Sequence, residues 1–425
     1  MTQNRRTSKD RVEILKQVQD DRVCGHISSH RHPELVSGSM QIAHGIAAKA
    51  NQLISKKTLF VTDEKIWQNC EAFFPENFLK TVAKKLILKS PKPDEKNLKK
   101  IAAAVKNCDL ILALGGGTIN DLCKFTSAKT NIPYAIFASA ASMNGYLSKN
   151  ASITISGHKK TLPATLPITV FCDLKILAKA PLELTKAGIG DSLCFYSCWF
   201  DWYLSHKILG TKFDARPFEM LQQKMDFFVK NFQKFSIRDE EFLKLLIEIL
   251  LLSGQGMTLA GGSYPASQAE HLIAHTIEMK YPEIAGKVLH GAQIAVTTLT
   301  ATGLQKQLLE APSFPSSITT LSSSTPRVKG DELVKFFGKK IASECQKEFE
   351  QKIFAQSQAK KLNWPNLKKD LKKIHFDEAR LKEIFAHFKI KTSARSLGLS
   401  NQQYQACVAH AKFIRNRFTI LDFLN

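Results

Sequence analysis

Short, largely apolar runs alternate with helix-like segments in the first half of the chain. Runs without a polar face are typical of buried strands in a parallel sheet that is covered on both sides. The alternation therefore predicts a doubly wound α/β domain, with a Rossmann-like fold, over residues 36–175. The predicted strands are residues 58–62, 85–88, 110–114, 134–138 and 169–172. The predicted helices are residues 42–54, 78–84 and 94–106, with another starting near residue 118.

Beyond residue 176 the pattern changes to helical periodicity without strands. Helices are expected at residues 242–252, 271–279, 292–304, 333–349, 377–388 and 402–413, with a Pro/Ser-rich surface loop at 312–326. Residues 1–35 are polar and are expected to form a mobile basic extension with at most one short helix, 11–19. The predicted domains are thus this extension, the α/β domain at 36–175 and an all-helical domain at 176–425. A cleft between the last two is the expected active site.

Composition narrows the class of protein. A chain of 425 residues is long enough for two cores. Its net charge of +22 suits anionic partners, but the lysines are spread as on solvated helix faces, so we expect no nucleic acid partner. No apolar run approaches the roughly 20 residues that span a bilayer. Scattered cysteines and the lack of a secretory segment predict a reduced, cytoplasmic protein.

Three glycines follow the predicted strand at 110–114. Gly115, Gly116 and Gly117 would let backbone N–H groups converge on an anion, and Thr118 stands at the start of the next helix. Strand, turn and helix N-terminus together predict a phosphate-binding site, although a turn without a ligand fits the same residues. Asp63, just after another strand, suits either a ribose hydroxyl or a helix cap.

Histidines and acids cluster in the predicted helical domain. His271 and His275 are four residues apart on one helix face, so spacing alone allows both to bind a metal. His290 precedes a glycine, and Asp191 follows two glycines at the expected start of a helix, where an N-cap is the simpler interpretation. One carboxylate and imidazoles are the ligands of a catalytic divalent metal.

Five separate stretches together resemble the sn-glycerol-1-phosphate dehydrogenase family, a relative of dehydroquinate synthase and the iron-containing alcohol dehydrogenases. The resemblance covers about residues 36–425 in consistent order. The matching stretches are Gly115–Lys124 (GGGTINDLCK), Ala140–Tyr146 (AASMNGY), Gly188–Asp191 (GIGD), Ala269–His275 (AEHLIAH) and Leu289–Gly291 (LHG), and the C-terminal LGLS and IRNRFTILD segments agree as well.

The resemblance implies roles for individual residues. It places the metal on Asp191, His271 and His290, with His275 on the substrate side. The dinucleotide contacts that it implies, together with the glycine turn, are Asp63, Gly115, Gly116, Gly117, Thr118, Asp121, Lys124, Ser139 and Ser142. Three positions depart from the family pattern: Asn144 stands in place of Asp, Tyr264 in place of Arg and Gln268 in place of Gly. Asn144 is a candidate catalytic residue, and it lacks the negative charge of the Asp that is usual at this position.

The expected reaction is reversible hydride transfer between NAD(H) or NADP(H) and dihydroxyacetone phosphate, giving sn-glycerol 1-phosphate for phospholipid metabolism. The expected metal is Zn²⁺, with Ni²⁺ and Fe²⁺ as alternatives. Lys159 and Lys160 suit either the substrate phosphate or a solvated turn. We expect a homo-oligomer. The alternatives are a glycerol or polyol dehydrogenase on the same scaffold, which needs no phosphate site, and a non-catalytic basic interaction protein derived from it.

Overall fold

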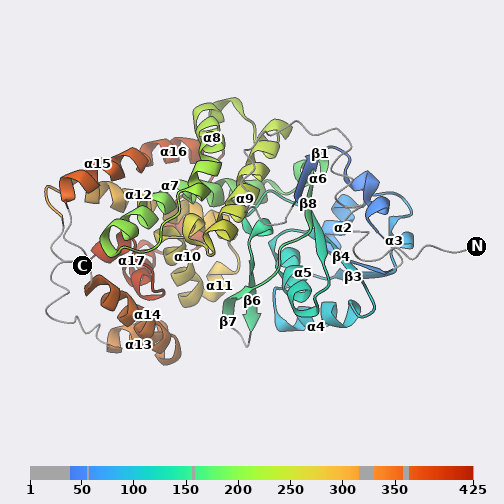
Figure 1. Cartoon of the computed structure of the whole chain (residues 1–425), viewed down its shortest axis with the longest axis horizontal. Coiled ribbons are helices and arrows are strands. Elements are labelled where there is room, and N and C mark those ends of the chain that lie inside the picture. The colour runs from blue at the N-terminus through green and yellow to red at the C-terminus, as the bar shows by residue number, and fades with distance from the viewer. Residues whose placement is uncertain (1–38, 55–56, 156–157, 315–329, 358–362, 425) are drawn as a thin grey trace, which may run out of the picture. The chain divides into compact units, whose positions relative to one another are not determined.

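The computed structural model describes residues 39–54, 57–155, 158–314, 330–357 and 363–424 (Figure 1). The chain divides into two compact units. The first comprises the residues up to Thr185 together with Ile237–Leu259, and the second comprises Lys186–Ser236 and Ala260–Asn425. The sequence-based boundary after residue 175 stays a prediction, but it would assign helix α9 (Glu240–Ala260) to the helical part, whereas α9 groups with the first unit. The expected extension at 1–35 and most of the loop at 312–326 lie outside the described residues.

A parallel sheet forms the centre of the first unit. It has six strands in the order β1-β8-β5-β4-β2-β3, and every neighbouring pair is parallel. This confirms the predicted α/β fold. The strands are β1 (Ser39–Ala43), β2 (Thr58–Asp63), β3 (Lys84–Leu88), β4 (Leu110–Gly115), β5 (Tyr134–Ala138) and β8 (Thr169–Asp173). The helices of this unit besides α9 are α2 (Glu64–Cys70), α3 (Phe78–Thr81), α4 (Glu95–Ala104), α5 (Gly117–Thr130) and α6 (Leu174–Lys179).

Several local features of this unit differ from the prediction. Helix α6 was not predicted, and the helix expected at 78–84 ends at Thr81. The helix expected at 42–54 is strand β1 followed by a short 3-10 helix, η1 (Ala47–Leu53), and Gly45 between them has φ 68°. β1 is held by its pairing with β8, a long-range contact that local periodicity does not reveal. The antiparallel hairpin β6 (Asn150–Ile155) and β7 (His158–Pro163) was not predicted.

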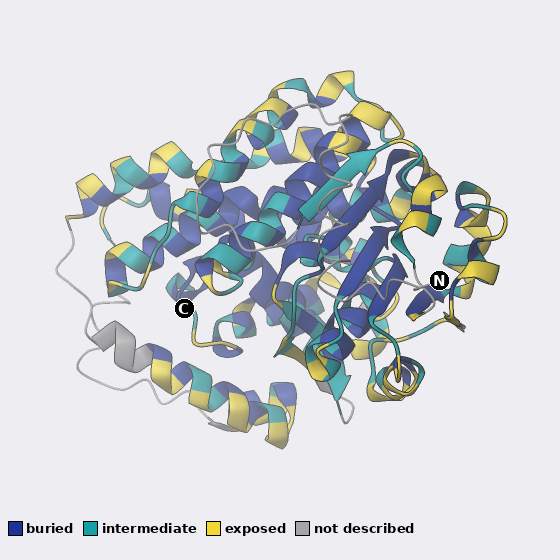
Figure 2. Ribbon diagram, turned by 45° about the vertical axis from the view of Figure 1, so that its right-hand side comes forward, coloured by how far each residue is buried: buried dark blue, intermediate teal, exposed yellow. Residues whose placement is uncertain are grey.

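Aromatic side chains fill one side of the sheet. Phe60 of β2 contacts Trp67, Phe74 and Phe78 edge-on, and Phe74 packs on Phe137 of β5. β2, β4, β5 and β8 are almost wholly buried, which is the dark blue centre of this unit in Figure 2. Because these strands are buried on both faces, their sequences are continuous apolar runs.

The second unit is helical in its described residues. Its apolar core runs through helices α7, α10, α12, α14, α15 and α17, as expected for the predicted helical domain. Only a helix start near Asp191 was predicted for α7, and helices α8, α11 and α15 were not predicted. The helices are α7 (Leu182–Leu209), α8 (Arg216–Asn231), α10 (Ala269–Lys280), α11 (Pro282–Ala285), α12 (His290–Glu310), α13 (Gly330–Phe337), α14 (Lys339–Ser357), α15 (Trp364–Ile374), α16 (Glu378–His387) and α17 (Asn401–His410).

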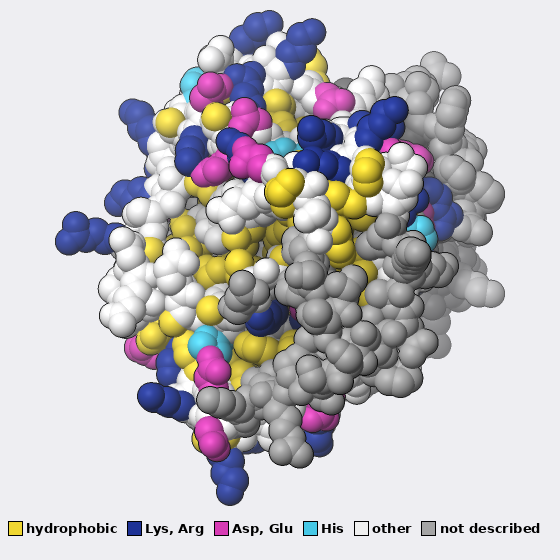
Figure 3. All heavy atoms as spheres, turned by 90° about the vertical axis from the view of Figure 1, so that its left-hand side faces the viewer, with side chains coloured by type: hydrophobic (Ala, Val, Ile, Leu, Met, Phe, Trp, Pro, Cys, Tyr) yellow, Lys and Arg dark blue, Asp and Glu magenta, His cyan; other side chains and the backbone are white. Residues whose placement is uncertain are grey.

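Helix α9 is long and apolar enough to cross a membrane, but 67% of its most apolar window is buried inside the protein. A core helix of a globular unit has the same character. On the face shown in Figure 3, Lys and Arg side chains lie mainly along the left and upper edges and in the upper middle, with Asp and Glu among them, and the described residues of this face form no continuous basic groove.

Candidate functional site

The carboxyl ends of β2 and β4 lie side by side, because Thr62 pairs with Leu114. The strand order reverses between these two strands: β3 lies beyond β2, and β5 and β8 lie beyond β4. In open α/β sheets, ligands bind at such a reversal, outside the carboxyl ends of the strands. Asp63 ends β2, and the glycine turn follows β4. The sheet therefore brings the predicted cofactor residues Asp63, Gly116 and Gly117 to one edge.

The three glycines of the turn have different surroundings. A Cβ on Gly115 would overlap the side chain of Ile119, so Gly115 permits α5 to pack closely on the strand. A Cβ on Gly116 or Gly117 would meet no atom nearer than 3.8 Å. Gly116 is the N-cap of α5 in an extended conformation and has no side chain to bond the first N–H groups of the helix. The lack of a close neighbour at Gly116 and Gly117 and the N–H groups of the helix start suit a phosphate.

Lys124 supports a loop. Its ammonium group is fully buried and donates hydrogen bonds to the carbonyl oxygens of Gly145 and Asn150 and to Ser148. Burial lowers the pKa of Lys124 to about 8, against the attraction of Asp121. Lys124 therefore supports the loop that carries Asn144, and its contact with the cofactor stays a prediction.

The other predicted residues of the first unit are placed as follows. Asp121 accepts a hydrogen bond from the backbone N–H of Ser152 and so anchors β6. The Asp63 side chain accepts hydrogen bonds from the backbone N–H groups of Lys65 and Ile66. It thus caps α2, which is one of the two roles that the sequence allowed for it. Thr118 and Ser142 are half-buried, and Ser139 is buried beside Gly116.

The Asn144 amide donates to Ser253 Oγ over 3.4 Å. Lys160 is exposed on β7, and the side chain of Lys159 lies outside the described side chains. Cofactor contact by these residues stays a prediction.

Asp191 lies inside the long helix α7, nine residues after its start at Leu182. The N-cap interpretation is therefore wrong. At this position the residue is 2% exposed. Burying a carboxylate is costly unless charges or donors surround it, so the reason for this acid lies in its neighbours.

Two glycines bring α7 against the start of α12. A Cβ on Gly190 would overlap the carbonyl oxygen of Gly291, and a Cβ on Gly291 would overlap the carbonyl oxygen of Ala187. No other residue fits where two backbones touch in this way. Since Asp191 follows Gly190 and His290 precedes Gly291, this contact brings the two side chains together.

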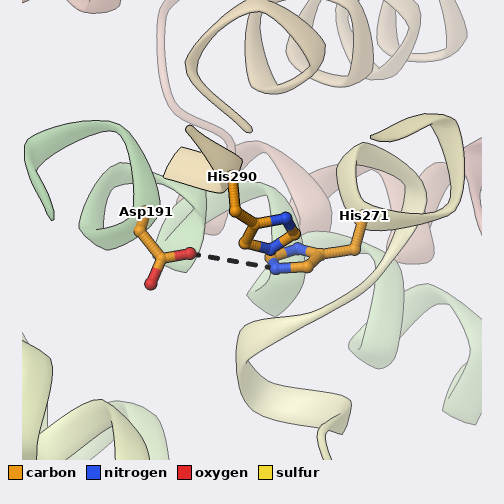
Figure 4. A group of neighbouring side chains, drawn as sticks. All are labelled: Asp191, His271 and His290. Carbon is orange, nitrogen blue, oxygen red and sulfur yellow. Dashed lines mark ion pairs between the residues drawn. The ribbon is translucent and has the colours of Figure 1, made fainter. Parts of the chain in front are cut away.

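Asp191, His271 and His290 converge, as Figure 4 shows. One carboxylate oxygen and one ring nitrogen from each histidine all lie within 4.8 Å of one another, and His271 Nε2 is 3.9 Å from Asp191 Oδ1. Ligands about 2.0–2.1 Å from a tetrahedral Zn²⁺ lie roughly 3.3 Å apart, so a small inward movement would complete such a site. The three side chains come from α7, α10 and α12.

Glu270 stands behind His271. Its Oε1 accepts hydrogen bonds from His271 Nδ1 at 2.9 Å, Cys198 Sγ at 3.0 Å and the Gln268 N–H at 2.7 Å, and its Oε2 accepts one from Ser197. Burial alone would raise the pKa of Glu270, but the His271 interaction outweighs it and lowers the pKa to about 2. A carboxylate only accepts hydrogen bonds, so His271 carries its proton on Nδ1 and turns the lone pair of Nε2 towards Asp191. A cation between this lone pair and the carboxylate of Asp191 would be stabilised by both groups.

His275 and His290 share a second acid that sequence reasoning missed. Glu278 Oε2 is 3.1 Å from His275 Nδ1, and Glu278 Oε1 is 3.5 Å from His290 Nδ1. The signal was present in the spacing, because residues 271, 275 and 278 lie on one face of α10. Burial lowers the pKa of His275 to about 4 despite the opposing effect of Glu278. His275 is therefore neutral near pH 7.

The first unit matches the family model described as iron-containing alcohol dehydrogenase, over residues 41–181. Among curated proteins, the chain is 33% identical over 265 residues to glycerol-1-phosphate dehydrogenase [NAD(P)+] from Thermococcus sibiricus, covering 61% of this chain and 72% of that protein. It is 29% identical over 285 residues to the enzyme of that name from Geobacillus thermodenitrificans, covering 63% of this chain and 70% of that protein.

Solved structures share the two-part fold. A probable glycerol dehydrogenase from Sinorhizobium meliloti gives a TM-score of 0.58 at 16% identity, covering 91% of this chain and 94% of that one. Sulfoacetaldehyde reductase from Bifidobacterium kashiwanohense in complex with NAD+ gives 0.57 at 15% identity, covering 94% and 97%. At these identities the likeness establishes the fold alone.

Proposed function

We propose that this chain, which belongs to the glycerol-1-phosphate dehydrogenase family, reversibly reduces dihydroxyacetone phosphate to sn-glycerol 1-phosphate with NAD(H) or NADP(H). One observation carries the proposal: in a chain with these relatives, the donor atoms of Asp191, His271 and His290 converge within 4.8 Å. A catalytic metal held by three protein ligands and open on one side suits the reduction of a carbonyl.

Asp191, His271 and His290 would hold the ion, and Zn²⁺, Fe²⁺ and Ni²⁺ all suit this set of ligands. When bound, the divalent ion supplies Lewis acidity towards the carbonyl oxygen, and the nicotinamide supplies the hydride. Asp191 also brings a negative charge, which reduces the net charge of the loaded site. Glu270 fixes His271 in the tautomer that offers Nε2.

His275 moves the proton. Its Nδ1–H is directed to Glu278, so Nε2 is free to accept. In alcohol oxidation Nε2 takes up the hydroxyl proton, directly or through water, and in carbonyl reduction it returns that proton to the oxygen. Asn144 contributes an amide that can both donate to and accept from the substrate, in place of the acid that is usual in the family.

The residues at the β2–β4 edge would bind the cofactor. Gly116, Gly117 and the N-terminus of α5 suit the pyrophosphate, and Asp63 suits a ribose hydroxyl. Thr118, Ser139 and Ser142 are candidates for further contacts, and Lys159 and Lys160 for the substrate phosphate. The eight cysteines of the described residues are free thiols, which supports a reducing, cytoplasmic location. Assembly into a homo-oligomer stays a prediction.

Comparing dihydroxyacetone phosphate with dihydroxyacetone tests the substrate. The protein is purified with its metal, and NADH and NADPH oxidation is followed at several concentrations of each ketone. We expect kcat/KM for the phosphate ester to exceed that for the free ketone by at least about tenfold, which corresponds to roughly 1.4 kcal/mol of binding to the phosphate. Preference for the free ketone would indicate a polyol dehydrogenase, and no turnover of either would favour a non-catalytic protein.

A further inference from the structure

Glu278 faces two of the three histidines in the site. It lies one turn beyond His275 on α10, and its two carboxylate oxygens point to different rings, Oε2 to His275 and Oε1 to His290. The side chain is only 15% exposed. The two rings stack at 5.8 Å between centroids with an interplanar angle of 19°, so they present the same edge to the acid.

A carboxylate fixes the tautomer of any imidazole that it contacts. Because an ionised Glu278 has no proton to donate, its hydrogen bond with His275 places the hydrogen of that ring on Nδ1, and its second oxygen, 3.5 Å from His290 Nδ1, favours the same tautomer in His290. The lone pair of each ring is then on Nε2. For His290 this is the atom left to bind a metal, and for His275 it is the atom left to exchange a proton with the substrate.

A second carboxylate of the site shows the same arrangement. Glu270 Oε1 accepts a hydrogen bond from His271 Nδ1 at 2.9 Å and so fixes the tautomer of that single ring. In the described part of the site, the carboxylates of Glu270 and Glu278 thus stand behind three histidines, and Glu278 faces two of these rings.

We propose that Glu278 is a positioning residue that holds His290 in the metal-binding tautomer and His275 in the proton-accepting tautomer at the same time. The inference rests on the proposed metal-dependent function. One acid would thereby couple the affinity of the site for its metal to the turnover of its substrate. With only one hydrogen-bond acceptor, only one of the two rings would keep its role.

Glu278→Gln tests this directly. The amide has the same shape, but its single oxygen accepts from only one ring, and its NH₂ group forces the other ring to put the proton on Nε2. One of the two functions must therefore suffer. Glu278→Asp keeps both acceptor oxygens on a shorter side chain. Glu283→Gln, at an exposed position on α11, makes the same chemical change outside the site and is the matched control.

The measurements are Co²⁺ affinity by competition with a chelator, the visible absorption of bound Co²⁺, and kcat and KM for dihydroxyacetone phosphate at saturating Co²⁺. We expect E278Q to weaken Co²⁺ binding by about 10–100-fold and to change the spectrum. At saturating Co²⁺, its kcat should fall while KM changes little. E278D should recover part of the affinity, and E283Q should match the wild type.

A double-variant experiment separates the two rings. In a His275→Ala background, E278Q should still weaken Co²⁺ binding but should lower kcat little further, because its effect on turnover passes through His275. Thermal melting checks that each variant is folded. If E278Q melts far below E283Q, then E278D decides, and an affinity no better than that of E278Q contradicts the proposal.

Co²⁺ affinity, Co²⁺ spectrum and kcat of E278Q all equal to those of E283Q would overturn the proposal. Failure of the proposed function gives a different result: the wild type would bind Co²⁺ but would not oxidise NADH with dihydroxyacetone phosphate, and the effect of Glu278 on Co²⁺ binding would remain. A wild type that binds no Co²⁺ would overturn both.

Discussion

At the scale of single residues, the burial of Asp191 inside a helix is explained only by the side chains around it. It is buried inside a helix, where its carboxylate cannot cap the helix start, and it faces His271 Nε2. The sequence identified the acid through its family motif, whereas local rules favoured a cap. Glu278 was missed because it lies beyond the stretch Ala269–His275 that resembles the family, although its spacing from His275 was visible. Ligand types and helix faces can be predicted from sequence; which side chains meet across three helices cannot.

Replacing the two histidines separately tests the assignment of ligands. His290→Ala should abolish tight metal binding, because it removes one of only three protein ligands. His275→Ala should leave metal content largely intact and should lower kcat by about 10²–10⁴-fold, the usual contribution of a general acid–base group. Metal content after dialysis, measured by elemental analysis, distinguishes the two. Loss of metal from both variants would mean that His275 is also a ligand.

At the scale of elements, the contact between α7 and α12 sets the geometry of the site. Gly190 and Gly291 let the two backbones touch, and Asp191 and His290 are their neighbours in sequence. α7 was not predicted in full because it is buried on nearly every side and carries little helical periodicity. The central strands were predicted within a residue or two, because continuous apolar runs signal doubly covered strands. β1 was not, because it depends on pairing with β8.

Gly190→Ala should damage this contact. The added methyl group would overlap the carbonyl oxygen of Gly291, so the helices must separate, at a cost of about 3 kcal/mol in the free energy of unfolding. Metal affinity should fall with it. Gly303→Ala is the control, because a Cβ there lies 3.5 Å from its nearest neighbour, an ordinary contact. Chemical denaturation of both variants measures the difference. Equal stability of the two would refute the proposed close approach.

At the scale of the whole molecule, the two units hold different chemistry. The first carries the open glycine turn at a reversal of strand order, and the second carries the converging carboxylate and histidines. The alternation of strands and helices predicted the first unit and the helical periodicity predicted the second. The grouping of α9 with the first unit was not visible in the sequence, because it depends on contacts such as that of Gly254 with the carbonyl oxygen of Asn144. The net charge of +22 would attract the two anionic reactants of the proposed reaction.

The central claim is that a metal on Asp191, His271 and His290 enables the reduction of dihydroxyacetone phosphate. The most direct measurement is NADH or NADPH oxidation with this substrate before and after removal of the metal by a chelator, and again after addition of Zn²⁺, Fe²⁺ or Ni²⁺. The account predicts activity in the protein as purified with metal, at least about a hundredfold loss after chelation, as expected when Lewis acidity worth several kcal/mol is removed, and recovery with one of the ions. Full activity of the metal-free protein would contradict it.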